Sequence, residues 1–214
     1  MQLMNSIVKI DDIYAEMIKG KLRDVNTKAN FLKENLTELG ELIGRELIAR
    51  YYVEHKNIVT PMDNQCVVPS ISNKKTVIVS TRDDFKYFAQ GIVNVIPNSD
   101  QGFMDFDGKR GISVLTSEVR LIKLPDLNNV ECVIVAKSVL ATGCTALSLL
   151  ERAINLYSPR LVIVATVFYS ESGVLDLKEK FPNVEIILIG EADTIDQDGM
   201  LIPGVGNIDK RIKE

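Results

Sequence analysis

Phosphate-binding chemistry is suggested by the segment of residues 137–150, KSVLATGCTALSLL. The segment predicts the end of a strand, a tight turn at Gly143 and the start of a helix. Residues 142–145 would present backbone N–H groups and two hydroxyl groups at the helix N-terminus, where the macrodipole adds partial positive charge. Such an arrangement binds phosphate. The spacing of a Walker loop is absent, and an ordinary strand–helix turn is the alternative interpretation.

The rest of the residue inventory restricts the possible chemistry. The single histidine, His55, lies in a polar stretch, which argues against polyhistidine metal sites and His-dependent triads. The three cysteines, Cys66, Cys132 and Cys144, have no metal-like spacing and are interpreted as free thiols in a reducing compartment. No metal site is predicted. Chemistry must rest on backbone amides, carboxylates, hydroxyls and basic side chains.

The elements that position these groups alternate along the chain. Short, nearly continuous apolar runs are typical of strands buried on both faces of a parallel sheet, and the segments between them fit crossover helices. This predicts a three-layer α/β fold, and a chain of 214 residues is expected to form a single domain. An amphipathic helix is predicted at about residues 28–50, capped by Asn26 or Thr27. The predicted strands are residues 76–80, 132–136, 161–168 and 184–190.

Two segments break this alternation. At about residues 105–125, turn dipeptides and short strand-like pieces predict a hairpin that projects from the sheet as a flap. At about residues 190–214 the chain is rich in Gly and Asp and predicts neither helix nor core strand. A long loop in a compact domain is usually functional. Ligands of open α/β sheets bind beyond the carboxyl ends of the strands, which is where residues 137–145 are expected.

Composition limits the partners. The net charge of −4 gives no electrostatic reason to expect nucleic acid or an anionic membrane surface. The start of the chain lacks the pattern of a signal peptide, and no apolar run reaches the roughly 20 residues that span a bilayer. We therefore expect a cytoplasmic protein whose ligand is a small nucleotide or phosphosugar.

Three segments resemble motifs of the uracil phosphoribosyltransferase family, in the family's order. LRDVNT at residues 22–27 resembles its N-terminal LRDKNT. LATGCTA at residues 140–146 resembles its phosphate loop, usually DPMLATGGSA. DGMLIPGVGNIDKR at residues 198–211 resembles its uracil-binding tail, usually GYIVPGLGDAGDR. The resemblance identifies the chain as a member of this family, with a parallel-sheet phosphoribosyltransferase fold, a β-hairpin flap and a C-terminal base-binding segment.

The resemblance implies the reaction of uracil with phosphoribosyl diphosphate to give UMP and diphosphate, a pyrimidine-salvage step that uses Mg²⁺. It also implies a homodimer or higher homo-oligomer. Backbone groups of Leu201 and Gly206 would bind the base. Such a site rejects a mismatched base, because buried groups would be left unpaired. The 5′-phosphate would be held by Ala141, Thr142, Gly143, Cys144 and Thr145.

The departures from the family pattern concern the residues expected to act in catalysis, Arg82, Lys137 and Asn207. Lys137 replaces the Asp that accepts hydrogen bonds from the ribose, and lysine has donors only. Asn207 replaces the Asp of PGLGD. Arg82 lies within one residue of the family's arginine, but the glycine-rich diphosphate loop is missing. Asp83 and Asp84 follow it instead, and two carboxylates repel a diphosphate unless a metal intervenes.

These residues also have ordinary structural interpretations. Lys137 would extend to solvent, Asp83 or Asp84 would cap a helix, and Arg82 would be a surface charge. Cys144 replaces a glycine, which is tolerated where φ is negative.

Three hypotheses remain open from the sequence. The first is an active uracil phosphoribosyltransferase, favoured by the phosphate loop and the tail. The second is a non-catalytic regulatory homologue that binds a nucleotide or phosphate, favoured by the lost carboxylates and diphosphate loop. The third is a phosphoribosyltransferase for another base. One lost charge contact commonly costs about 10²–10³ in rate, so several losses favour weakened activity.

Overall fold

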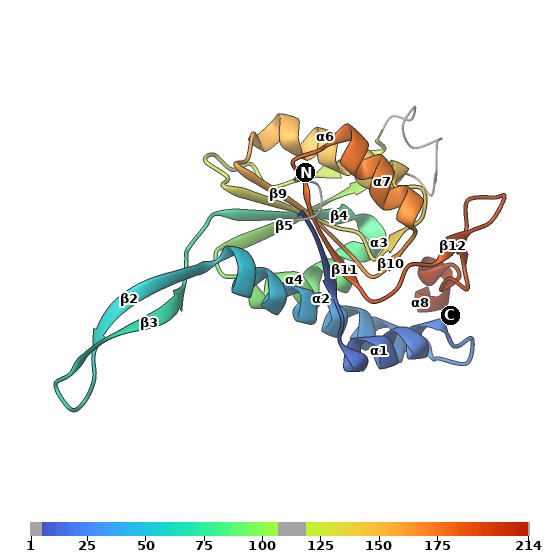
Figure 1. Cartoon of the computed structure of the whole chain (residues 1–214). Coiled ribbons are helices and arrows are strands. Elements are labelled where there is room, and N and C mark those ends of the chain that lie inside the picture. Colours follow the sequence, from blue (N-terminus) through green and yellow to red (C-terminus); the bar gives the residue numbers. More distant parts are fainter. Residues whose placement is uncertain (1–5, 107–118, 214) are drawn as a thin grey trace.

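The computed structural model describes residues 6–106 and 119–213 and is built on a seven-stranded sheet (Figure 1). The strand order is β1-β11-β9-β7-β4-β5-β6. All neighbouring strands run parallel except β6, which pairs antiparallel with β5. The strands are β1 (Ile7–Ile10), β4 (Thr76–Thr81), β5 (Ser99–Asp105), β6 (Leu121–Lys123), β7 (Cys132–Ala136), β9 (Leu161–Thr166) and β11 (Glu185–Ile189).

Helices cover both faces of the sheet, so the predicted three-layer α/β fold is confirmed. α1 (Ile13–Arg23), α2 (Ala29–Tyr51) and α4 (Phe88–Val95) pack on one face, and α6 (Cys144–Tyr157) and α7 (Glu171–Lys180) pack on the other. Alternate residues of one strand serve opposite faces: Ile134 belongs to the first core, and Val133 and Val135 to the second. This explains why the central strands are continuously apolar.

The long N-terminal helix lies almost where it was predicted. α2 is Ala29–Tyr51, against a predicted range of about 28–50. The predicted cap is wrong: the N-cap residue is Lys28, which makes no side-chain capping bond. Asn26 instead donates to Asp24, and the hydroxyl of Thr27 donates to the carbonyl of Lys21. These two side chains stabilise the turn between α1 and α2.

Several elements were missed by the sequence analysis. β1 and α1 precede the first predicted helix. β2 (Val53–Val59) and β3 (Gln65–Ile71) form an antiparallel hairpin that extends away from the body of the molecule (Figure 1). In the predicted flap, β5 and β6 pair at its two ends, and residues 107–118 lie outside the described residues.

The C-terminal segment is more regular than predicted. It contains the short hairpin of β12 (Thr194–Ile195) and β13 (Leu201–Ile202), followed by the helix α8 (Ile208–Lys213). The prediction that it lacks helix is therefore wrong, because six residues close it as α8. Figure 1 shows this segment beside α1 at one edge of the molecule. Within the described parts of the chain, no helix has the length and apolarity needed to cross a membrane.

Candidate functional site

A cavity of about 400 Å³ opens at the carboxyl ends of the central strands. Its volume lies in the range of small-molecule sites. Four stretches line it, taken from residues 81–84, 104–106, 137–146 and 198–209. The predicted phosphate loop and the predicted base-binding loop, about 60 residues apart in the sequence, therefore line one space.

The phosphate loop has the backbone geometry that the sequence predicts. Gly143 is the N-cap of α6 with a φ of 73°, and no side chain caps this helix end. A Cβ at Gly143 would lie 2.9 Å from the carbonyl oxygen of Gly173. Cys144 is the first helical residue and does not have a positive φ, so its replacement of glycine is tolerated. The first N–H groups of α6 have no intrahelical partner and line the cavity wall.

A second loop supports the phosphate loop from behind. α7 begins at its N-cap Ser170, whose hydroxyl donates to the carbonyl of Ala141 at 2.6 Å and accepts from the N–H of Gly173 at 2.9 Å. A Cβ at Gly173 would lie 2.2 Å from the Ala141 oxygen, so the two loops are in backbone contact. The short parallel strands β8 (Val139–Leu140) and β10 (Phe168–Tyr169) continue this contact. The phosphate loop is thus held rigidly.

Lys137 forms a buried ion pair with Asp84. The Lys137 ammonium lies 2.6 Å from the Asp84 carboxylate, and their side chains are 18% and 5% exposed. The same carboxylate accepts from the hydroxyls of Thr81 and Ser138 and from the Ser138 N–H. The interpretation of Lys137 as a solvent-directed side chain is therefore wrong. Asp84 does not cap α3 (Arg82–Phe85), whose N-cap Thr81 makes no side-chain capping bond.

The cavity end near α3 is acidic. Arg82 is 3.0 Å from Asp105, so its charge is already paired. Asp83 and Asp209 of α8 both line this end, and Asp83 is close enough to act on the Asp209 carboxyl group. Burial, and next the neighbouring charge of Asp83, raise the pKa of Asp209 to about 6. A diphosphate at this end would find Arg82 and Lys137 already paired with carboxylates and would be repelled by the carboxyl groups of Asp83 and Asp209.

The predicted base-binding residues and Asn207 differ in position. Leu201 and Gly206 line the cavity, and Asn207 is not among its lining residues. The side-chain oxygen of Asn207 accepts from the N–H of Lys210, and its carbonyl accepts from the N–H of Arg211, so Asn207 begins α8. The structure therefore brings together the predicted phosphate, base, Arg82 and Lys137 positions, but gives Asn207 a capping contact.

The sequence analysis missed two features of the site: the pairing of Asp84 with Lys137, and the carboxyl group of Asp209. The partner role of Asp84 depends on β4 and β7 being neighbours in the sheet. Asp209 stands where the tail motif GLGDAGDR has glycine, two residues after the Asp that Asn207 replaces. The sequence could therefore have indicated Asp209, because it places a carboxylate two residues after Asn207.

The side chains of the described residues decide whether the protein itself could hold a metal ion. Among residues 6–106 and 119–213, no three His, Cys, Asp or Glu side chains are grouped so that they could hold a metal ion. The described residues thus provide no set of side chains that could bind a metal ion without other ligands.

Comparison with known proteins gives a consistent result. The model of the uracil phosphoribosyltransferase family matches residues 10–212. A uracil phosphoribosyltransferase of Pyrobaculum islandicum is 27% identical over 202 residues, covering 94% of this chain and 96% of that protein. The one of Pyrococcus furiosus is 28% identical, covering 94% and 86%. A solved structure of an Aquifex aeolicus protein has a TM-score of 0.79 at 27% identity and covers 96% of this chain and 97% of that one.

The ion pair of Lys137 and Asp84 yields a stability prediction. Asp84→Ala leaves a largely buried ammonium without its partner, which typically costs about 3 kcal/mol or more. Glu151→Ala, which removes the exposed pair with Lys180, is the matched control and should cost less than about 1 kcal/mol. Urea unfolding of both variants measures the difference. Equal losses would show that the buried pair is not a determinant of stability.

The carboxyl pair of Asp83 and Asp209 yields a pH prediction. Because the pKa of Asp209 is raised from 3.8 to about 6, the folded state binds its proton more tightly than the unfolded state. The free energy of unfolding therefore falls as pH rises from about 4 through 6. Asp209→Asn should remove this fall, so the variant should exceed the wild type in stability at pH 7, with the excess shrinking towards pH 4.

Thermal unfolding between pH 4 and 8 measures this effect, with Asp176→Asn on the exposed face of α7 as the control. A stability excess of Asp209→Asn that does not change with pH would contradict the assignment.

Proposed function

Because the chain belongs to the uracil phosphoribosyltransferase family, we propose that it transfers the phosphoribosyl group of phosphoribosyl diphosphate to uracil, with UMP and diphosphate as products. The supporting observation is the single cavity lined by both the N-terminus of α6 and residues 201–206. A nucleoside monophosphate has its phosphate and its base at opposite ends, as this cavity has its two loops.

The proposed roles follow from what each group can donate or accept. The N–H groups and hydroxyls of residues 142–145 would bind the 5′-phosphate, assisted by the α6 macrodipole. Backbone groups of Leu201 and Gly206 would bind the uracil edge. The two loops would hold the base nitrogen N1 against the anomeric carbon, where its new bond forms as the bond to diphosphate breaks.

Mg²⁺ is part of this proposal as the ion that accompanies phosphoribosyl diphosphate. Magnesium sites commonly use substrate phosphates and water with few protein ligands, so the absence of a cage among the described residues is compatible with it. When bound, the ion would neutralise charge on the leaving diphosphate.

A second function is supported by the acidic end of the cavity. Arg82 and Lys137 are both paired with carboxylates, and Asp83 and Asp209 add two further carboxyl groups close to each other. These features oppose a diphosphate but leave the phosphate loop and base loop intact. We therefore propose, as the alternative, a protein that binds a pyrimidine nucleotide without transfer. A phosphoribosyltransferase for another base would use the same cavity with different contacts at residues 201–206.

The deciding experiment measures UMP by liquid chromatography after incubation with uracil, phosphoribosyl diphosphate and Mg²⁺. If the protein is an enzyme, Thr142→Ala should lower the rate about tenfold or more, because a hydrogen bond to a charged phosphate is lost. Thr37→Ala on α2 is the matched control.

Binding of UMP with no UMP formation would select the alternative function. Turnover of another base with none of uracil would select altered specificity. A folded protein that binds neither UMP nor phosphoribosyl diphosphate would contradict every form of the proposal.

We further propose a cytoplasmic homodimer in which the β2–β3 hairpin contacts a second copy. Val59, Met62 and Val67 of this hairpin are 63%, 80% and 64% exposed. A two-stranded hairpin with apolar side chains in water is only marginally stable alone, and burial against another copy would stabilise it. The three free cysteines fit a reducing compartment.

Sedimentation velocity tests the dimer. The wild type should sediment as a dimer, and Val59→Asp with Val67→Asp should sediment as a monomer, because charge would be buried at the contact. Leu156→Asp and Leu175→Asp, at exposed positions of α6 and α7, are the matched control and should stay dimeric. A monomeric wild type would contradict this proposal.

A further inference from the structure

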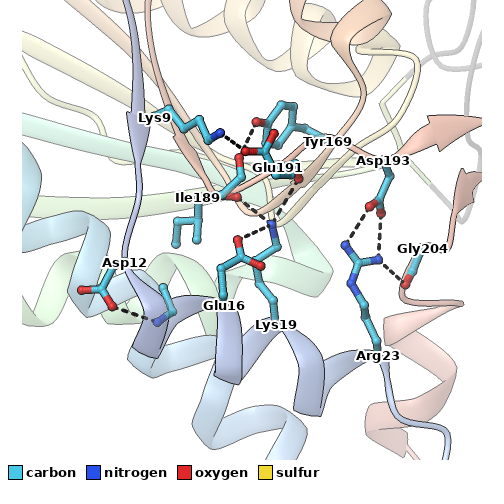
Figure 2. Close-up of polar contacts among 12 residues, drawn as sticks. Lys9, Asp12, Glu16, Lys19, Arg23, Tyr169, Ile189, Glu191, Asp193 and Gly204 are labelled. Atoms are coloured by element: carbon cyan, nitrogen blue, oxygen red, sulfur yellow. Dashed lines mark hydrogen bonds and ion pairs between the residues drawn. The ribbon is translucent and has the colours of Figure 1, made fainter.

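The loop expected to bind the base is held in place by two arginines that do not line the cavity. This base loop comprises residues 201–206. Arg23, at the end of α1, and Arg211, in α8, contact its backbone, and neither is among the residues that line the cavity. Figure 2 shows Arg23 reaching from α1 to Asp193 and Gly204.

Arg23 makes three hydrogen bonds and one ring contact. Its guanidinium donates to both carboxylate oxygens of Asp193 at 2.9 and 2.7 Å and to the carbonyl of Gly204 at 2.8 Å. It also lies 5.0 Å from the ring centre of Phe168. The Asp193 side chain is only 3% exposed, so it depends on this partner. Paired donors of this kind fix both position and orientation.

Arg211 joins the same parts from the other side. It donates to the carbonyls of Leu22 and Asp24, which flank Arg23, at 2.5 and 2.6 Å. It also donates to the carbonyl of Val205 at 2.9 Å. Successive carbonyls of the base loop, at Gly204 and Val205, therefore each accept from an arginine.

α1 itself is anchored to the sheet. Lys19, one turn before Arg23, is buried and donates to the carbonyls of Ile189 and Glu191 at 2.7 and 3.3 Å (Figure 2). These carbonyls lie at and just beyond the end of β11. The base loop is thus connected through Arg23 and α1 to the sheet that also carries the phosphate loop.

We propose that Arg23 is a positioning residue that sets the affinity for the base half of the ligand without touching the ligand. With the Gly204 carbonyl held by Arg23, the backbone groups of Leu201 and Gly206 keep one orientation towards the cavity. This inference rests on the proposed function for the identity of the ligand. The phosphate loop has its own contacts with Ser170 and Gly173. Arg23 reaches these only indirectly, through its ring contact with Phe168 and through Asp193, whose N–H donates to the carbonyl of Tyr169. A change at Arg23 should therefore affect the base loop more than the phosphate loop.

Titration calorimetry with UMP and with ribose 5-phosphate separates the two halves of the ligand. Arg23→Gln should weaken UMP binding about tenfold while changing ribose 5-phosphate binding less than twofold. Arg23→Lys should recover part of the loss, because one ammonium cannot replace the paired donors. Arg50→Gln, which removes an exposed pair with Glu46 on α2, is the matched control.

Unchanged UMP binding by folded Arg23→Gln would overturn the inference, and so would equal loss for both ligands. Should Arg23→Gln not fold, Asp193→Asn keeps the side-chain volume and removes the charge that orients Arg23, so it should weaken UMP binding in the same direction but by less. If the wild type binds neither ligand, the proposed function fails separately, and amide hydrogen exchange then decides. Faster exchange in residues 201–206 of Arg23→Gln, with residues 141–145 unchanged, would sustain the positioning role, and equal exchange would overturn it.

Discussion

The carboxylate of Asp84 joins the ends of two neighbouring strands, and the shape of the cavity depends on that connection. It accepts from Thr81 at the end of β4 and from Lys137 and Ser138 just after β7. The phosphate loop begins directly after these residues, so its starting point is fixed by this contact. With 5% of its side chain exposed, Asp84 needs all of these donors to offset the loss of hydration.

This connection also changes the charge of the site. Where the family pattern has a carboxylate that would face the sugar, Lys137 is turned to Asp84 instead. Arg82 is similarly turned to Asp105. Among the described residues that line the cavity, the backbone N–H groups at the start of α6 then supply positive potential, an arrangement that suits a phosphate. The cavity thus has a helix N-terminus, which suits an anion, at one end and carboxyl groups, which disfavour a second, unaccompanied anion, at the other.

The sequence predicted the parts of the fold that carry strong local signals. The central strands are buried on both faces, so their continuous apolar runs stand out, and the 23 residues of α2 have a clear helical period. β1 has four residues, and β2 is almost wholly exposed, so neither has a strong apolar pattern. The turn at Gly143 and the start of α6 were predictable because glycine followed by a helical pattern is a local signal. The pair of Lys137 and Asp84, 53 residues apart, was not, because it requires knowing that β4 and β7 are neighbours.

The two ends of the described chain support each other at the base loop. The base loop and the phosphate loop therefore depend largely on different elements. The phosphate loop is held by β8, β10 and the start of α7, which all belong to the central part of the chain. The base loop is held by α1 and α8 through Arg23 and Arg211. The two sets of contacts meet at Phe168 of β10, beside Arg23, and at Asp193, whose N–H donates to the carbonyl of Tyr169. Changes in α1 should therefore act more strongly on the base loop, which Arg23 contacts directly, than on the start of α6.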